Sequence, residues 1–169
     1  AAGTCNLTSA SSGTKSITAT YAGDANYNPS PASTAVSHPV SPPSTTTTIT
    51  NAAALGTATV VGQAYPVTWT VTVNAPGTLG APMTGNVTVS DGVATCVALV
   101  SAGACNLTST SAGAKSLTAT YAGDANYLGS ASTPATAHTV NAAATTTTIT
   151  NTAALATATV VGQTYPVNW

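Results

Sequence analysis

The chain has almost no charged side chains. Two lysines and three aspartates are present in 169 residues, arginine and glutamate are absent, and charged residues make up 3% of the sequence, against about 25% in ordinary globular domains. A nucleic-acid-binding protein needs clustered Lys and Arg to displace counterions from phosphates, and attraction to an anionic membrane surface needs similar clusters. The composition therefore argues against nucleic acid and lipid headgroups as partners.

Long apolar runs and helix signals are also missing. No stretch of about 18 apolar residues is present to span a bilayer, so we expect no membrane insertion in this segment. No signal peptide begins the chain, and we expect Ala1 to be an internal or processed start. The sequence contains no Ser-His-Asp spacing, phosphate-binding loop or carboxylate pair. We therefore predict that the protein is not an enzyme and uses no cofactor.

Threonine, alanine, serine and valine dominate the chain instead, and hydrophobic residues make up 43% of it. Thr and Val favour strands, because their branched Cβ atoms pack well on a pleated surface. In residues 65–73, Val67, Trp69 and Val71 alternate with threonines, as in a strand with one buried face. Disorder is the alternative for so much Ser, Thr, Gly and Pro, but these alternating apolar positions favour an ordered fold.

The sequence repeats itself with a period of 100 residues. Residues 115–127 (KSLTATYAGDANY) recur at 15–27 with one change, and residues 1–69 share 46 identities with residues 101–169. The differences concentrate in residues 28–44, which end in a proline-rich linker. We predict the C-terminal part of one repeat at 1–44, a complete repeat at 45–144, and the N-terminal part of the next at 145–169.

About seven short strands are predicted in the complete repeat, separated by turns. The spacing of these strands is typical of an all-β, antiparallel, Ig-like β-sandwich. The predicted strands are residues 45–50, continued by 58–61 after an alanine-rich turn at 51–55, then 65–73, 85–90, 93–99, 104–108, 115–121 and 130–140. Residues 93–99 and 104–108 are predicted to form a hairpin.

Four motifs resemble those of bacterial immunoglobulin-like repeat domains. They are TTTTIT at residues 45–50, VGQxYPV at 61–67, GNVTVSDG at 85–92 and KSLTATYAGDANY at 115–127. Such domains recur in tandem arrays on bacterial surface proteins and adhesins, and the resemblance covers the whole chain. It implies a role as spacer, stalk or adhesive rod, with no common catalytic site.

Cys96 and Cys105 flank the predicted hairpin. If their strands pair, the two Cβ atoms lie about 4.5–5.5 Å apart, close to the reach of a disulfide. Buried free thiols are one alternative, and a metal site is another, although no CxxC motif or histidine pair supports it. Cys5 is the counterpart of Cys105, and we expect its partner to lie before the start of this sequence. A disulfide predicts an oxidising, extracellular location.

Asp124 and Asn126, repeated as Asp24 and Asn26, form the only cluster suited to a cation. Calcium prefers six to eight oxygen ligands, usually including several carboxylates. These residues are therefore weak metal candidates, and we favour capping of backbone N–H groups in a turn. Asp91 is assigned to a turn for the same reason.

Several single residues invite a functional reading. Lys115 is a candidate for a cross-link to asparagine, but an exposed charge guarding a strand is the simpler interpretation. His38 and His138 have no acid or cysteine beside them in sequence. Asn6, Asn86 and Asn106 match the N-glycosylation pattern, which is frequent by chance in a Thr-rich chain. The threonines at 45–48 and 145–148 are candidates for O-linked sugar.

The two ends of the sequence admit two interpretations. Separate chains would complete each other, the end of one joining the start of the next. That arrangement lacks equivalents of residues 70–100, so we favour a window of a longer array. The leading function is a structural extracellular repeat, with neighbouring repeats or copies of itself as partners. The alternative is a module that binds surface glycans or a host surface through residues 74–82, 122–126 and Tyr127.

Overall fold

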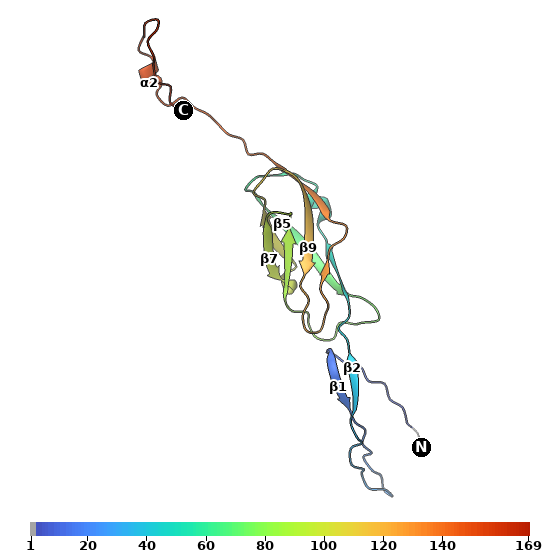
Figure 1. The fold of residues 1–169 in the computed structure, drawn as a ribbon. Helices are drawn as coiled ribbons and strands as arrows, with labels where there is room; N and C mark the ends of the chain where they lie inside the picture. The colour runs from blue at the N-terminus through green and yellow to red at the C-terminus, as the bar shows by residue number, and fades with distance from the viewer. Residues whose placement is uncertain (1–2) are drawn as a thin grey trace.

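The computed structural model describes residues 3–169, and it is elongated (Figure 1). A central β-sandwich runs from β3 (Thr45–Ile49) to β11 (Thr136–Asn141). At one end lies a two-stranded ribbon of β1 (Gly13–Ile17) and β2 (Val36–Val40). At the other end an extended segment leads to the short helix α2 (Thr152–Leu155). Within residues 3–169, no helix has the length and apolar character needed to cross a bilayer.

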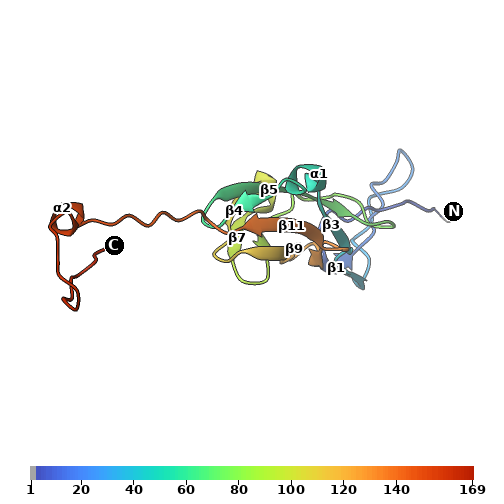
Figure 2. The same ribbon diagram turned by 90° about the horizontal axis from the view of Figure 1, so that it is seen from above.

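The sandwich consists of two sheets (Figure 2). The three-stranded sheet has the order β3, β5 (Ala64–Val73), β8 (Ala104–Thr108). The six-stranded sheet has the order β4 (Thr59–Val60), β11, β9 (Gly113–Tyr121), β6 (Asn86–Ser90), β7 (Thr95–Leu99), with β10 (Ser130–Ala131) paired to β9. All pairs are antiparallel except β4 with β11. The predicted all-β antiparallel sandwich is therefore confirmed.

The core lies between the two sheets and follows the period-2 pattern. On β5, Tyr65, Val67 and Trp69 are buried, while the residues between them are more exposed. Each fully buried aliphatic or aromatic side chain contributes about 1.5–3 kcal/mol of transfer free energy, so this stripe holds the sheets together. The other strands contribute Ile49, Val87, Val89, Leu107, Leu117, Ala119, Tyr121 and Val140.

The predicted hairpin of β7 and β8 is wrong. β7 pairs with β6, whereas β8 pairs with β5 in the opposite sheet. A 3₁₀ turn at Val100–Ala102 (η1) and Gly103, whose φ is 67°, separate the two strands. The left-handed conformation of Gly103 is one that glycine adopts at no steric cost, and it turns the chain from one sheet to the other.

Two further elements differ from the prediction. The alanine-rich turn is a short helix, α1 (Ala52–Leu55), which buries Leu55, and alanine has the highest helix propensity. The predicted last strand is divided into β10 and β11. Pro134 lies between them and has no N–H group to donate to the ladder, which accounts for the break.

The parts outside the sandwich repeat its local structure. Lys15 pairs with His38 between β1 and β2, in the register in which Lys115 pairs with His138 between β9 and β11. Likewise α2 occupies the sequence position of α1, displaced by one period. The buried residues lie between Thr45 and Val140. The boundaries at 44/45 and 144/145 remain predictions.

Candidate functional site

A disulfide joins Cys96 on β7 to Cys105 on β8, with the two Cα atoms 6.0 Å apart. Because β7 and β8 are edge strands of different sheets, the bond links the two layers of the sandwich rather than two strands of a hairpin. Cys5, the counterpart of Cys105, is an exposed free thiol. Its expected partner lies outside the sequence, so that pairing remains a prediction.

The Asp124 carboxylate is occupied by hydrogen bonds from the protein. Its Oδ1 accepts from the N–H groups of Asn126 (2.7 Å) and Tyr127 (3.0 Å). Its Oδ2 accepts from the N–H (2.7 Å) and hydroxyl (2.9 Å) of Thr84. Burial opposes ionisation of Asp124, but these hydrogen bonds outweigh it and lower the pKa. The carboxylate therefore caps the turn and ties it to the loop before β6.

The repeated pair, Asp24 and Asn26, forms the same turn. Asp24 Oδ1 accepts from the N–H groups of Asn26 and Tyr27. Its pKa is lowered, first by the hydrogen bond from the Tyr21 hydroxyl. Among the described residues no three His, Cys, Asp or Glu side chains gather as a metal-binding group. Asp24 and Asp124 thus share one observed role, capping a turn.

A buried polar chain in the sandwich was not predicted. Ser109 Oγ donates to Asp91 Oδ2 at 2.6 Å and lies 2.8 Å from the Tyr65 hydroxyl. Asp91 Oδ1 caps the turn by accepting from the N–H groups of Val93 and Ala94. Burial works against the charge on Asp91, but these bonds prevail and lower its pKa, aided by Lys115. Asp91 thus has the predicted turn role and also ties the turn between β6 and β7 to Ser109, which in turn contacts Tyr65 on β5.

His138 is a buried structural link. Its Nδ1 lies 2.8 Å from the Leu55 carbonyl, so Nδ1 donates that hydrogen bond, and its Nε2 is hydrogen-bonded to Thr59 Oγ1 at 2.8 Å. The ring also packs against Tyr65, with centroids 4.2 Å apart. The ring therefore joins β11 to α1 and β4. His38, its counterpart, is exposed on β2.

The modification candidates differ in accessibility. Asn6, Asn86 and Asn106 are exposed, and their glycosylation remains a prediction. Within 45–48, Thr45 and Thr47 are buried and hydrogen-bonded to Ser130. Their hydroxyl groups are therefore inaccessible, and the prediction of O-linked sugar at these two positions is wrong. Thr46, Thr48 and residues 145–148 are exposed. Lys115 Nζ donates to Ser111 Oγ at 2.7 Å.

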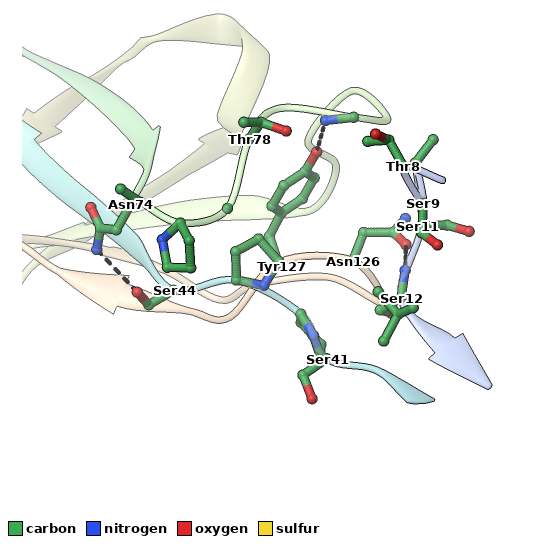
Figure 3. Close-up of a pocket in the computed structure, with 18 of the residues that line it drawn as sticks. Thr8, Ser9, Ser11, Ser12, Ser41, Ser44, Asn74, Thr78, Asn126 and Tyr127 are labelled. Carbon is green, nitrogen blue, oxygen red and sulfur yellow. Dashed lines mark hydrogen bonds between the residues drawn. The ribbon is translucent and has the colours of Figure 1, made fainter. Parts of the chain in front are cut away.

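A cleft of about 530 Å³ lies where the N-terminal segment meets the sandwich (Figure 3). Three parts of the chain contribute to its lining: residues 7–12, the end of β2 with the linker at residues 41–44, and the loop at residues 74–80 together with Asn126 and Tyr127. Its walls carry mainly serine, threonine, asparagine and proline side chains, together with His38, and no carboxylate or lysine. The cleft is therefore a mostly uncharged junction between the N-terminal segment and the sandwich.

Hydrogen bonds cross this junction at two points. The Ser12 N–H donates to Asn126 Oδ1 at 3.0 Å (Figure 3), and the Ser12 hydroxyl donates to the Ala125 carbonyl. The Ala81 N–H donates to the Ala10 carbonyl at 3.3 Å. The loops that the alternative hypothesis assigned to a glycan therefore contact the preceding segment.

Tyr127 shapes the loop on the sandwich side of the junction. Its hydroxyl accepts from the Gly80 N–H at 3.0 Å and donates to the Ala81 carbonyl at 2.6 Å. The side chain is 2% exposed. Tyr127 therefore supports the loop from below and presents no ring face to a ligand, contrary to the role that the alternative hypothesis gave it.

Comparison with known proteins agrees with this architecture. No curated protein matches the chain. A family model described as bacterial Ig-like domain (group 3) matches residues 52–141, which include α1 and the sandwich from β4 to β11. The matched segment spans more than half of the sequence. The chain belongs to the bacterial Ig-like domain family.

Proposed function

We propose that this chain is a section of an extracellular structural array, in which successive Ig-like repeats give length to a stalk, adhesin shaft or filament. The observation that carries the proposal is the repeat itself. Residues 1–69 and their counterparts one period later share 46 identities, and β1–β2 has the register of β9–β11. Neighbouring repeats, or copies of the chain in a fibre, are the proposed partners.

The disulfide supports a location outside the cytoplasm. Bonds such as Cys96–Cys105 persist in oxidising compartments and are rare where glutathione and thioredoxin keep thiols reduced. The bond also links the two sheets, which suits a domain that is pulled. The scarcity of charge limits repulsion between chains packed side by side.

The site geometry favours a structural role over chemistry. Ser109, Asp91 and His138 are residue types used in catalysis, but all three are buried. Each holds other elements of the sandwich by hydrogen bonds. The cleft at the junction is lined by no Asp, Glu, Lys or Arg side chain. These features fit a repeat that acts by its shape and stability.

Labelling of intact cells that produce the protein tests this proposal. We expect an antibody against the repeat to label unpermeabilised cells, and we expect alkylation of the isolated protein to find Cys96 and Cys105 blocked. A cytosolic protein used as control should stay unlabelled until the cells are permeabilised. Exclusively intracellular protein with both thiols reduced would contradict the proposal.

A further inference from the structure

We infer that consecutive repeats dock through one recurring surface, so that the array is a chain of fixed joints rather than of freely hinged domains. This inference rests on the proposed array. The docking corner is residues 9–12 of one repeat. The receiving loops are residues 77–81 and 123–127 of the next. The partner for the surface is thus another copy of the same repeat.

The contacts at the joint use mainly backbone groups. The Ala10 carbonyl accepts from the Ala81 N–H, and the Ser12 N–H donates to the Asn126 side chain. Backbone groups are present whatever the side chain, so this pattern tolerates the sequence differences between repeats. Asn126 is the one side chain that supplies an acceptor across the joint, and its own N–H is held by Asp124.

Gly80 shows how closely the two parts approach. A Cβ atom built at this position would lie 2.6 Å from the Ala10 carbonyl oxygen, and its three nearest neighbours all belong to Ala10. Carbon and oxygen atoms that are not bonded do not approach so closely. The φ of Gly80 is not in the left-handed region, so its own backbone conformation does not require glycine. The requirement comes from the preceding repeat.

The linker is part of the same joint. The Leu128 N–H donates to the Pro43 carbonyl at 3.0 Å. A Cβ at Gly77 would lie 2.3 Å from Pro43 Cβ, so the linker proline is packed against the loop at Gly77. Because proline fixes its own φ and restricts the preceding residue, the linker adds stiffness to a joint that is already closed by hydrogen bonds.

The complete repeat carries the docking corner at its other end. Residues 109–112 correspond to residues 9–12, and Thr110, Ser111 and Ala112 are exposed. Thr110 has the carbonyl that Ala10 uses, and Ala112 has the N–H that Ser12 uses; only the Ser12 hydroxyl has no equivalent. We therefore expect residues 109–112 to bind the receiving loops of the following repeat.

Amide hydrogen exchange in the 169-residue chain tests the joint. We expect the amides of Ser12 and Ala81 to be protected, and we expect Gly80→Ala to reduce protection at both by about tenfold or more, because its methyl group separates the two parts. The matched control is Gly56→Ala. Gly56 lies at the end of α1, and its counterpart in the next repeat is already Ala156. This control should leave both amides protected.

A second variant keeps the test decisive if Gly80→Ala perturbs the sandwich itself. Asn126→Ala removes the acceptor of the Ser12 N–H, and protection should fall at Ser12 while the core amide of Ala119 stays protected. Unprotected Ser12 and Ala81 in the natural chain, or unchanged protection in both variants, would overturn the joint. Such a result would leave the length and location of the array untouched, so it is distinguishable from failure of the proposed function.

Discussion

Cys96 and Cys105 are only nine positions apart in sequence, yet their disulfide joins the edge strands of two different sheets. The strands β7 and β8 leave the turn at Val100–Ala102 in separate layers. No backbone ladder connects the two strands, so the disulfide is the bond that fastens this side of the sandwich. Its removal therefore acts on the packing of the two sheets.

We predict that the double variant Cys96→Ser, Cys105→Ser is less stable by about 2–3 kcal/mol, since closing a loop of this length restricts the unfolded chain by that amount. Urea unfolding followed by Trp69 fluorescence measures the difference. The natural protein treated with reductant should match the double variant. Equal midpoints for the oxidised and reduced protein would show that the bond adds nothing to stability.

A second prediction concerns Asp91, whose carboxylate holds Ser109 and two backbone N–H groups. Asp91→Ala leaves these donors without an acceptor: the buried Ser109 hydroxyl, left unsatisfied, costs about 1–3 kcal/mol, and loss of the more exposed turn bonds adds about 1 kcal/mol. We expect a total loss of about 2–4 kcal/mol in the free energy of unfolding, measured by urea titration.

Asp91→Asn is the informative companion of that variant. It keeps one carbonyl oxygen for the turn, so its loss should be smaller than that of Asp91→Ala. Asp24→Ala changes a solvent-exposed turn and should cost clearly less than Asp91→Ala. If Asp91→Ala were as mild as Asp24→Ala, the buried chain from Asp91 through Ser109 to Tyr65 would have no role in stability.

The third prediction is a loss of stability at alkaline pH. Burial raises the pKa of Tyr121 from 10.0 to about 12, with a further contribution from Asp124. Because the folded protein binds this proton more tightly than the unfolded chain, the stabilisation is complete below pH 10.0 and is lost as the pH rises towards about 12. The free energy of unfolding should therefore fall as the pH is raised from 10.0 towards about 12.

Tyr121→Phe separates this effect from general alkaline damage. The variant loses the hydrogen bond to the Thr84 carbonyl and should be less stable at neutral pH by about 1 kcal/mol. Its stability should then change less between pH 10.0 and about 12 than that of the natural protein. Tyr65, whose pKa is also raised by burial, keeps part of the dependence. Identical pH profiles would contradict the assignment to Tyr121.

Most strands could be predicted from the sequence, because a half-buried strand carries its signal locally. The alternation of Val67 and Trp69 with threonines is such a signal, and both side chains are buried as expected. The separation of β7 and β8 could not be predicted in this way. This separation depends on the conformation at Gly103 and on the sheet that each strand joins. The alternation of residues within a single strand contains no information on either.

The functional residues divide along the same line. The turn role of Asp124 follows from neighbours two and three positions away, and local sequence predicts it. The roles of Ser109 and His138 were missed because their partners are distant in sequence. The partners of Ser109 lie at least 18 positions away, and those of His138 lie at least 79 positions away. Gly80 was missed because its constraint comes from Ala10, across the junction, where the sequence shows only another loop glycine.

The central claim is that the protein acts by being long, and electron microscopy of the native protein tests it most directly. Variants with one repeat deleted or added should form rods whose length changes by about 35–45 Å per repeat, given strands of about ten residues that rise 3.3 Å each. Compact particles, or a length that does not depend on the number of repeats, would contradict the claim.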